Sequence, residues 1–216
     1  HLKEDLMRSF SLSDNSIYSI YKDYEGGIWI GTMFGGVNYL PNRILTFAKY
    51  VPGSDPYSLN TKRIRGLAED NNGCIWIGTE DNGVNVLDPR TGKVHQIYDN
   101  VPGRLITLSV KHYENHIYVG LFKQGMNDIS IPGEHLKYVS DKDLGIEEGS
   151  VYSFLKDSKG RTWIGPGWGL YVSQPKERKF HRVEEVGYNW VFDIMEARDG
   201  TIWLATMGNG VWKCDP

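Results

Sequence analysis

The stretch Asp70–Val86, DNNGCIWIGTEDNGVNV, decides the fold because the chain repeats it. Nearly the same residues occur as Asp23–Tyr39, DYEGGIWIGTMFGGVNY, and weaker copies run from Asp157 to Val172 and from Ala197 to Lys213. The weakest copy, His112–Ile129, has tyrosine where the others have tryptophan. These anchor residues are spaced 47, 42, 45 and 40 positions apart: Trp29, Trp76, Tyr118, Trp163 and Trp203. Self-similarity at about 40–45 residues with a β-type unit is typical of propeller blades.

Each copy has the same parts, which the second copy shows most clearly. A polar turn, Asn71–Gly73, supplies positive φ at low cost and predicts a hairpin. The run Ile75–Ile77 combines β-branched and aromatic residues, as expected for a strand buried on both faces. Gly78 follows at a position where a larger side chain would collide with the next sheet. A second turn, Asn82–Gly83, leads into the alternating strand Val84–Val86.

Two further strands complete each predicted blade. In four copies a β-branched residue lies twelve positions before the tryptophan, which fixes the register of the inner strand; in copy three, Leu105 and Ile106 compete for that position. The expected inner strands are Ile17–Tyr21, Ile64–Ala68, Leu105–Val110, Val151–Leu155 and Val191–Met195. More polar outer edge strands are expected at Leu45–Tyr50, Val94–Tyr98, His135–Val139 and Lys179–Val183.

The repeated pattern is an apolar pair followed in order by D-x-x-G, I-W-I-G-T and G-G-V-N-Y. This pattern closely resembles the two-component regulator propeller repeat. The resemblance covers essentially the whole chain: copies one and two match closely, copies four and five partly, and copy three poorly. It implies an all-β fold, a β-propeller with five repeats of four-stranded antiparallel blades. It also implies the sensor domain of a hybrid two-component system protein. Such sensors usually carry more repeats than this chain shows.

The predicted domain is a single β-propeller unit over residues 1–216. Its blades are expected at roughly 13–50, 60–99, 104–140, 149–184 and 188–216. Residues 5–11 resemble an unpaired fourth strand, which would complete the last blade and close a five-bladed ring without exposed edges. Alternatively, the chain is an arc of a larger propeller. Both interpretations remain open from the sequence.

Composition narrows the class of protein. Gly accounts for 25 of 216 residues, above the average share of about 7%, which is typical of a turn-rich β protein. A formal charge of −3 gives no footprint for nucleic acid. No apolar run approaches the ~20 residues that span a bilayer, and His1–Phe10 lacks the apolar core of a signal peptide. The expected location, the periplasmic or extracellular part of a membrane-anchored receptor, therefore places signal and anchor outside this sequence.

Two kinds of connection are expected to surround one mouth of the central channel: the turns between second and third strands, and the segments leading into the inner strands. Propeller ligands commonly bind there. Flat aromatic faces pack on the C–H face of a pyranose, while amides and Arg bind hydroxyls or acidic groups. The candidate ligand-binding residues are Trp168, Trp190, Tyr188, Asn189, Phe34, Arg63, Arg104, Asp81, Lys123, Gln124 and Asn209. In the competing interpretation, Trp168 and Trp190 only pack between blades.

Three functions are weighed. The first is a non-catalytic sensor that binds an oligosaccharide or polysaccharide fragment and signals to a cytoplasmic histidine kinase, with a homodimer as the switching unit. The others are a protein-binding scaffold and a propeller-type polysaccharide lyase or glycoside hydrolase, whose carboxylate pair would meet only in the fold. No nucleophile motif, phosphate loop or Cys/His cluster is present, so no catalytic residue, metal or cofactor is expected. The turn aspartates are interpreted as turn formers: Asp23, Asp70, Asp157 and Asp199.

Overall fold

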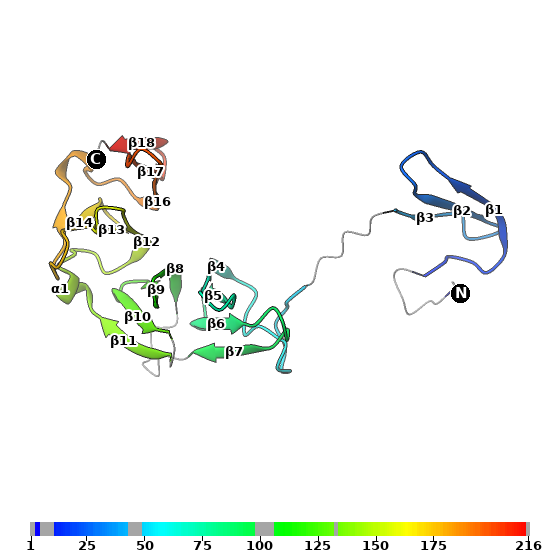
Figure 1. Cartoon of the computed structure of the whole chain (residues 1–216), viewed down its shortest axis with the longest axis horizontal. Coiled ribbons are helices and arrows are strands. Elements are labelled where there is room, and N and C mark those ends of the chain that lie inside the picture. Colours follow the sequence, from blue (N-terminus) through cyan, green and yellow to red (C-terminus); the bar gives the residue numbers. More distant parts are fainter. Residues whose placement is uncertain (1–2, 5–10, 43–48, 98–105, 132–133, 215–216) are drawn as a thin grey trace. The chain divides into compact units, whose positions relative to one another are not determined.

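The computed structural model describes residues 3–4, 11–42, 49–97, 106–131 and 134–214. In these residues the strands form five separate antiparallel sheets, each built from consecutive strands of the chain, which confirms the all-β propeller fold. Contacts divide the chain into two compact units, His1–Lys49 and Tyr50–Pro216, described separately below (Figure 1). The single domain over 1–216 and ring closure by residues 5–11 stay predictions, and residues 5–10 lie outside the described residues.

The first unit contains one three-stranded sheet. Its strands, in spatial order, are β1 (Ile17–Lys22), β2 (Ile28–Thr32) and β3 (Val37–Leu40). The Trp29 and Tyr39 rings pack across β2 and β3 with their centroids 4.5 Å apart. The outer strand predicted at Leu45–Tyr50 falls largely on residues 43–48, which lie outside the described residues.

The second unit contains four sheets. The first three are four-stranded. One contains β4 (Ile64–Glu69), β5 (Ile75–Thr79), β6 (Val84–Leu87) and β7 (Val94–Ile97). The next contains β8 (Thr107–Tyr113), β9 (His116–Leu121), β10 (Met126–Ser130) and β11 (His135–Val139), and the third contains β12 (Val151–Lys156), β13 (Thr162–Pro166), β14 (Tyr171–Ser173) and β15 (His181–Arg182). The fourth has β16 (Val191–Glu196), β17 (Ile202–Thr206) and β18 (Val211–Cys214). Figure 1 shows the first strand of each sheet nearest the centre of this unit, and β8 contacts β4 and β12 while β12 contacts β16.

Helices contribute little to either unit. Helix α1 (Asp141–Leu144) and a 3-10 turn (Glu184–Val186) lie in the connections that follow β11 and β15. The helical segments of the described ranges are too short and too polar to cross a bilayer.

The predicted inner strands are confirmed in four copies and corrected in the third. β1, β4, β12 and β16 begin at the predicted residues. In copy three the strand begins at Thr107, which pairs with Leu121 as Ile64 pairs with Thr79, so Thr107 takes the first position instead of Ile106. The cause is the hairpin of β8 and β9, which is one residue shorter between these paired positions than the equivalent hairpin of β4 and β5. Leu105 lies outside the described residues.

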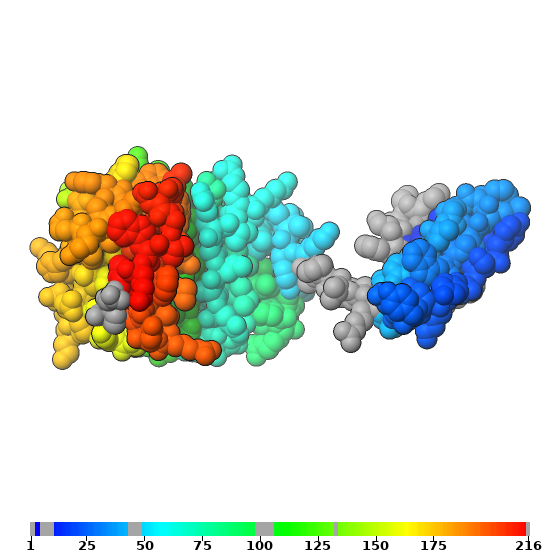
Figure 2. All heavy atoms as spheres, turned by 90° about the horizontal axis from the view of Figure 1, so that it is seen from above, coloured from blue at the N-terminus to red at the C-terminus, as the bar shows by residue number. Residues whose placement is uncertain are grey.

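Small residues allow the blades of the second unit to pack closely. A Cβ atom on Gly120 would overlap the Val151 carbonyl oxygen of the next sheet, and one on Gly165 would meet the Val191 carbonyl. The same two carbonyls accept hydrogen bonds from Ser109 (3.0 Å) and Ser153 (2.9 Å), which joins consecutive inner strands. The collision expected beyond these glycines is therefore observed, and the four blades of the second unit form one closely packed body of atoms (Figure 2).

The turn aspartates do more than form turns. Asp70 accepts hydrogen bonds from two backbone N–H groups of its own turn and, at 2.9 Å, from Nε1 of Trp76. The equivalent indole bonds are made by Asp23 and Asp157, each at 2.8 Å. Asp199 is a turn former as predicted, because its carboxylate accepts the Thr201 backbone N–H at 3.0 Å. The position equivalent to Asp70 is occupied by Ala197 in the last blade, so the anchor indole is held by a buried or half-buried carboxylate in three blades, those of Trp29, Trp76 and Trp163.

The free energy of unfolding should depend on pH through the ionisation of Asp157. Burial opposes ionisation, but hydrogen bonds from Trp163 and Arg161 outweigh it and hold the pKa of Asp157 below its usual value. Arg161 Nε lies 2.6 Å from the Asp157 carboxylate. A lowered folded-state pKa stabilises the protein above the unfolded value of about 3.9, and this contribution disappears as pH falls through the folded value.

We therefore expect the free energy of unfolding to fall between about pH 5 and pH 2, and Asp157→Asn to flatten part of that fall. Urea denaturation at a series of pH values measures both curves. Glu185→Gln, which removes an exposed carboxylate, is the control and should leave the slope unchanged. Parallel curves for wild type and Asp157→Asn would contradict the assignment.

Candidate functional site

A β-bulge marks the start of every inner strand. The pairing register shifts at the second residue of β1, β4, β8, β12 and β16, leaving that residue out of the ladder. The bulged residues are Tyr18, Arg65, Leu108, Tyr152 and Phe192. Bulges re-aim a side chain and are common beside functional sites. In the second unit, all four bulged residues line one cavity.

This channel cavity has a volume of about 330 Å³. Its lining comes from all four inner strands of the second unit: Arg65, Gly66, Leu67, Leu108, Ser109, Val110, Lys111, Tyr152, Phe192 and Asp193. Lys111 Nζ lies 3.2 Å from Asp193 Oδ1, so an ion pair connects β8 to β16. The volume lies at the lower end of the range of about 300–1,000 Å³ for small-molecule sites.

An aromatic cluster forms one side of this region and consists of Tyr152, Trp168, Trp190 and Phe192. Trp190 lies at its centre, with ring centroids 5.5 Å from Trp168, 5.7 Å from Tyr152 and 6.1 Å from Phe192. Trp168 is half exposed, at 49%, and Phe192 is 41% exposed. Burial, with the nearby charge of Glu148, raises the pKa of Tyr152, so its hydroxyl stays a neutral donor. The cluster offers accessible ring faces beside the cavity.

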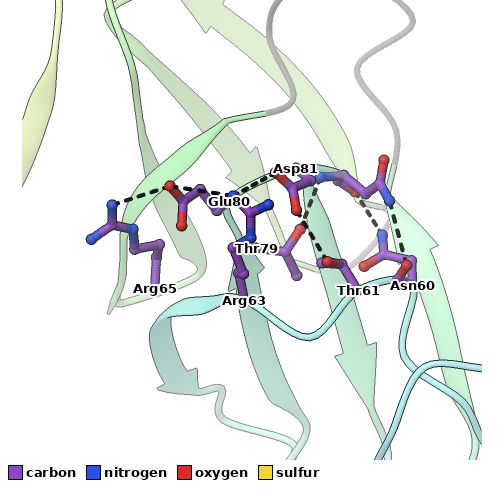
Figure 3. Close-up of polar contacts among 8 residues, drawn as sticks. Asn60, Thr61, Arg63, Arg65, Thr79, Glu80 and Asp81 are labelled. Atoms are coloured by element: carbon purple, nitrogen blue, oxygen red, sulfur yellow. Dashed lines mark hydrogen bonds and ion pairs between the residues drawn. The ribbon is translucent and has the colours of Figure 1, made fainter.

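A charged cluster on the β4–β5 blade consists of Arg63, Arg65, Glu80 and Asp81 (Figure 3). Arg65 lies 3.4 Å from Glu80, and Arg63 lies 3.9 Å from Glu80 and 3.6 Å from Asp81. Thr61 also donates to Asp81 at 3.3 Å. Each arginine therefore faces a carboxylate, and Arg65 belongs to both this cluster and the cavity lining.

Glu148 connects the turns near the aromatic cluster. Its Oε2 accepts backbone N–H bonds from Ser150 and Gly167, each at 3.0 Å, and its Oε1 accepts the Ser150 hydroxyl at 2.7 Å. The Ser150 oxygen in turn accepts the Lys123 N–H at 3.1 Å. One carboxylate therefore holds the Trp168 turn and, through Ser150, the Lys123 turn of the preceding blade.

The structure gathers some of the predicted site residues into two groups. Trp168 and Trp190 meet in the aromatic cluster, and Arg63 and Asp81 meet in the charged cluster. Because Trp168 and Trp190 come from consecutive blades, they also pack between blades, as the competing interpretation held. Their packing leaves Trp168 half exposed, and its role in binding a ligand stays a prediction.

The other predicted residues lie apart from these groups. Tyr188 covers the Arg182 guanidinium at 4.0 Å, while Asn189 donates to Val186 and accepts from Asn209. Lys123 is exposed, with φ of 56°, and Gln124 is half-buried in the same turn. Phe34 belongs to the first unit and is 82% exposed, and Arg104 lies outside the described residues. Whether any of them binds a ligand stays a prediction.

Five residues that line the cavity lie on the inner strands themselves and were not among the predicted site residues: Arg65, Tyr152, Phe192, Lys111 and Asp193. A signal was present, since the bulged residue directly follows the β-branched residue that sets the register in the copies with Ile64, Val151 and Val191. Regular alternation would have turned that position toward a neighbouring sheet instead of into the channel. The described residues contain no group of three or more His, Cys, Asp or Glu side chains placed to hold a metal ion.

Three segments match the profile of the family described as two component regulator propeller: residues 11–34, 58–81 and 186–208. Each segment contains the inner strand, the first turn and the second strand of a blade, in copies one, two and five. The recognition of this repeat is therefore confirmed. Among the curated proteins, no sequence matches the chain.

Solved structures with the same fold include two from B. thetaiotaomicron. The extracellular domain of BT3049, described as a hybrid two component system, is 25% identical with a TM-score of 0.66, over 99% of this chain and 29% of that one. The extracellular domain of BT4673, described as a one component system, is 19% identical with a TM-score of 0.60, over 92% of this chain and 26% of that one. The chain thus spans less than a third of either protein's domain.

A computationally designed protein, Ika4, is 15% identical with a TM-score of 0.56, over 75% of this chain and 98% of that one. Like the BT4673 match, it supports the fold alone.

Proposed function

The chain carries repeats of the two-component regulator propeller family, and from this premise we propose that it is the ligand-sensing part of a hybrid two-component receptor. The sensor binds an oligosaccharide or another glycan fragment and signals to a cytoplasmic histidine kinase elsewhere in the parent protein. It lies on the periplasmic or extracellular side of the membrane, as the extracellular origin of its structural relatives supports. The domain itself is non-catalytic.

The observation that carries glycan binding is the meeting of two kinds of side chain at one cavity. Tyr152 and Phe192 bring the aromatic cluster to the cavity wall, and Arg65 brings the charged cluster to it. Ring faces pack on the apolar C–H groups of a pyranose, and Arg and carboxylate groups hydrogen-bond its hydroxyls. A site with apolar walls and a few fixed polar groups is the usual form of a small-molecule pocket.

The carboxylates of the site support binding without catalysis. Glycoside hydrolysis uses two carboxyl groups that flank the scissile bond, one of them protonated. Here Glu80 and Asp81 face Arg63 at 3.9 and 3.6 Å, and Asp193 faces Lys111 at 3.2 Å. Each of these carboxylates is therefore engaged in an ion pair, an arrangement that suits hydrogen bonding to sugar hydroxyls.

Signalling requires that the ligand bind two receptor arrangements with different affinity. The channel cavity is suited to this because β4, β8, β12 and β16 all contribute to its lining. A ligand held there contacts four blades at once and would be sensitive to small changes in their relative placement. A homodimer remains our proposal for the unit that changes arrangement.

A thermal-unfolding screen against neutral, uronic and sulfated oligosaccharides tests the proposal. A ligand of the native state at one hundred times its dissociation constant stabilises it by about 2.7 kcal/mol, which raises the melting temperature. The double variant Trp168→Ala/Trp190→Ala should lose the shift and still unfold cooperatively, because Trp168 is half exposed. No shift with any sugar would contradict the proposal, and so would the appearance of sugar cleavage products in the same samples.

A further inference from the structure

We propose that the channel cavity selects a neutral saccharide over an acidic one, with Tyr152 and Phe192 as its aromatic contacts. This inference rests on the proposed glycan-binding function and names the class of glycan. It follows from how the charges that line the cavity are already engaged, and from the positions at which the bulged residues enter it.

Each cation in the described lining of the cavity faces a carboxylate. Arg65 lies 3.4 Å from Glu80, and Lys111 lies 3.2 Å from Asp193. Arg63, next to the cavity residue Arg65 in the charged cluster, faces both Glu80 and Asp81. A uronate or sulfate entering this site would meet carboxylates as well as cations and would have to break an existing pair. Like-charge contact of this kind disfavours binding.

A neutral sugar avoids that cost. Its hydroxyl groups donate to a carboxylate and accept from the paired cation, so Arg65–Glu80 and Lys111–Asp193 can stay intact. Tyr152 adds a neutral hydroxyl, because burial raises the pKa of its phenol. The polar part of the site therefore matches a polyhydroxyl ligand without net charge.

The aromatic contacts complete the selection. Tyr152 and Phe192 both occupy bulge positions and both line the cavity, with ring centroids 5.3 Å apart in an edge-on arrangement. Their rings are therefore not stacked on each other. One face of Tyr152 stacks on Trp190, and the remaining surface of the pair is what a pyranose ring would contact. A volume of about 330 Å³ fits the end of an oligosaccharide better than a long segment of a polymer.

Calorimetric titration of the intact chain tests the inference with six probes. The neutral tetrasaccharides are built of galactose, mannose, xylose or arabinose, and the acidic ones are tetragalacturonate and a heparin-derived tetrasaccharide. At least one neutral probe should bind, and both acidic probes should bind at least about tenfold more weakly than it does. Tyr152→Ala and Phe192→Ala should each raise the dissociation constant of the neutral probe by about tenfold.

The sharpest test is whether a variant gains affinity for an acidic sugar. Glu80→Gln/Asp81→Asn leaves Arg63 and Arg65 without their carboxylate partners, so affinity for tetragalacturonate should rise about tenfold. The control Glu25→Gln/Glu69→Gln makes the same change in net charge at two exposed glutamates outside the charged cluster, one in the turn after β1 and one at the last residue of β4, and should not produce this gain.

The outcomes separate the two proposals. Tighter binding of an acidic probe by the unmodified chain, or no gain in Glu80→Gln/Asp81→Asn, overturns the neutral selection while sugar sensing stands. If binding depends on Trp168 and Trp190 but not on Tyr152 and Phe192, the proposed role of the cavity is overturned while the glycan-binding function stands. Failure of every probe to bind overturns the proposed function and this inference with it.

Discussion

Replacing Gly120 by alanine is expected to destabilise the second unit by about 3–5 kcal/mol, a large part of the stability of an ordinary domain. The added Cβ would overlap the carbonyl oxygen of Val151 and the hydroxyl of Ser109. Neither neighbour can move cheaply, because Ser109 donates to that carbonyl at 3.0 Å and Val151 begins the next inner strand. Urea denaturation followed by tryptophan fluorescence measures the loss.

The last blade supplies the control. Ala205 occupies the equivalent position there and is exposed, so Ala205→Gly should change stability by no more than about 1 kcal/mol, mainly through chain entropy. Gly165→Ala should behave like Gly120→Ala, because its Cβ would meet the carbonyl of Val191. A Gly120→Ala protein as stable as the parent chain would show that the third and fourth blades do not pack as described.

Replacing Asp70 by alanine is expected to cost about 2–4 kcal/mol. The change removes the acceptor of three hydrogen bonds, from the N–H groups of Asn72 and Cys74 and from Nε1 of Trp76. Trp76 is only 1% exposed, so its indole N–H loses a partner that water cannot replace. The free energy of unfolding in urea, compared at one pH, measures the effect.

A double-mutant cycle with Trp76→Phe isolates the indole bond. Phenylalanine has no N–H to satisfy, so the cost of Asp70→Ala should be smaller in that background by about 1 kcal/mol or more. Ala197→Asp is the converse control, since it places a carboxylate beneath Trp203, which is 37% exposed; it should be neutral or slightly stabilising. Equal costs of Asp70→Ala in both backgrounds would mean that the indole bond contributes nothing.

The fold was predictable because its determinants are local and repeated. Ile-Trp-Ile-Gly after a polar turn reports a buried strand, its turn and its close approach to the next sheet within a few residues. The same periodicity set the start of β4, β12 and β16. It failed in copy three, where a turn shorter by one residue moved the strand to Thr107, because counting back from Tyr118 assumes constant turn length.

The site was predictable only in part. The turns and inner-strand approaches pointed to Trp168, Trp190, Arg63 and Asp81, which meet in two pairs but do not line the cavity, so their binding of a ligand stays a prediction. They missed Tyr152 and Phe192, because a strand pattern of period two assumes a regular ladder, and a bulge breaks it. The sequence also gave no sign that Asn209 donates a hydrogen bond to Asn189, and whether either residue binds a ligand stays a prediction.

The repeat, its resemblance to a known propeller repeat, the all-β blades and the structural place of the anchor tryptophans could be predicted from the residues alone. These properties depend on side-chain size, backbone freedom and hydrophobic pattern within one copy, which recur wherever the copy recurs. Which charges are paired and which side chains share the cavity depends on how the blades pack against one another. Lys111 and Asp193 are 82 positions apart in the chain, yet Nζ of the lysine lies 3.2 Å from Oδ1 of the aspartate. A pattern within one copy of the repeat cannot predict a contact between residues so far apart in the sequence.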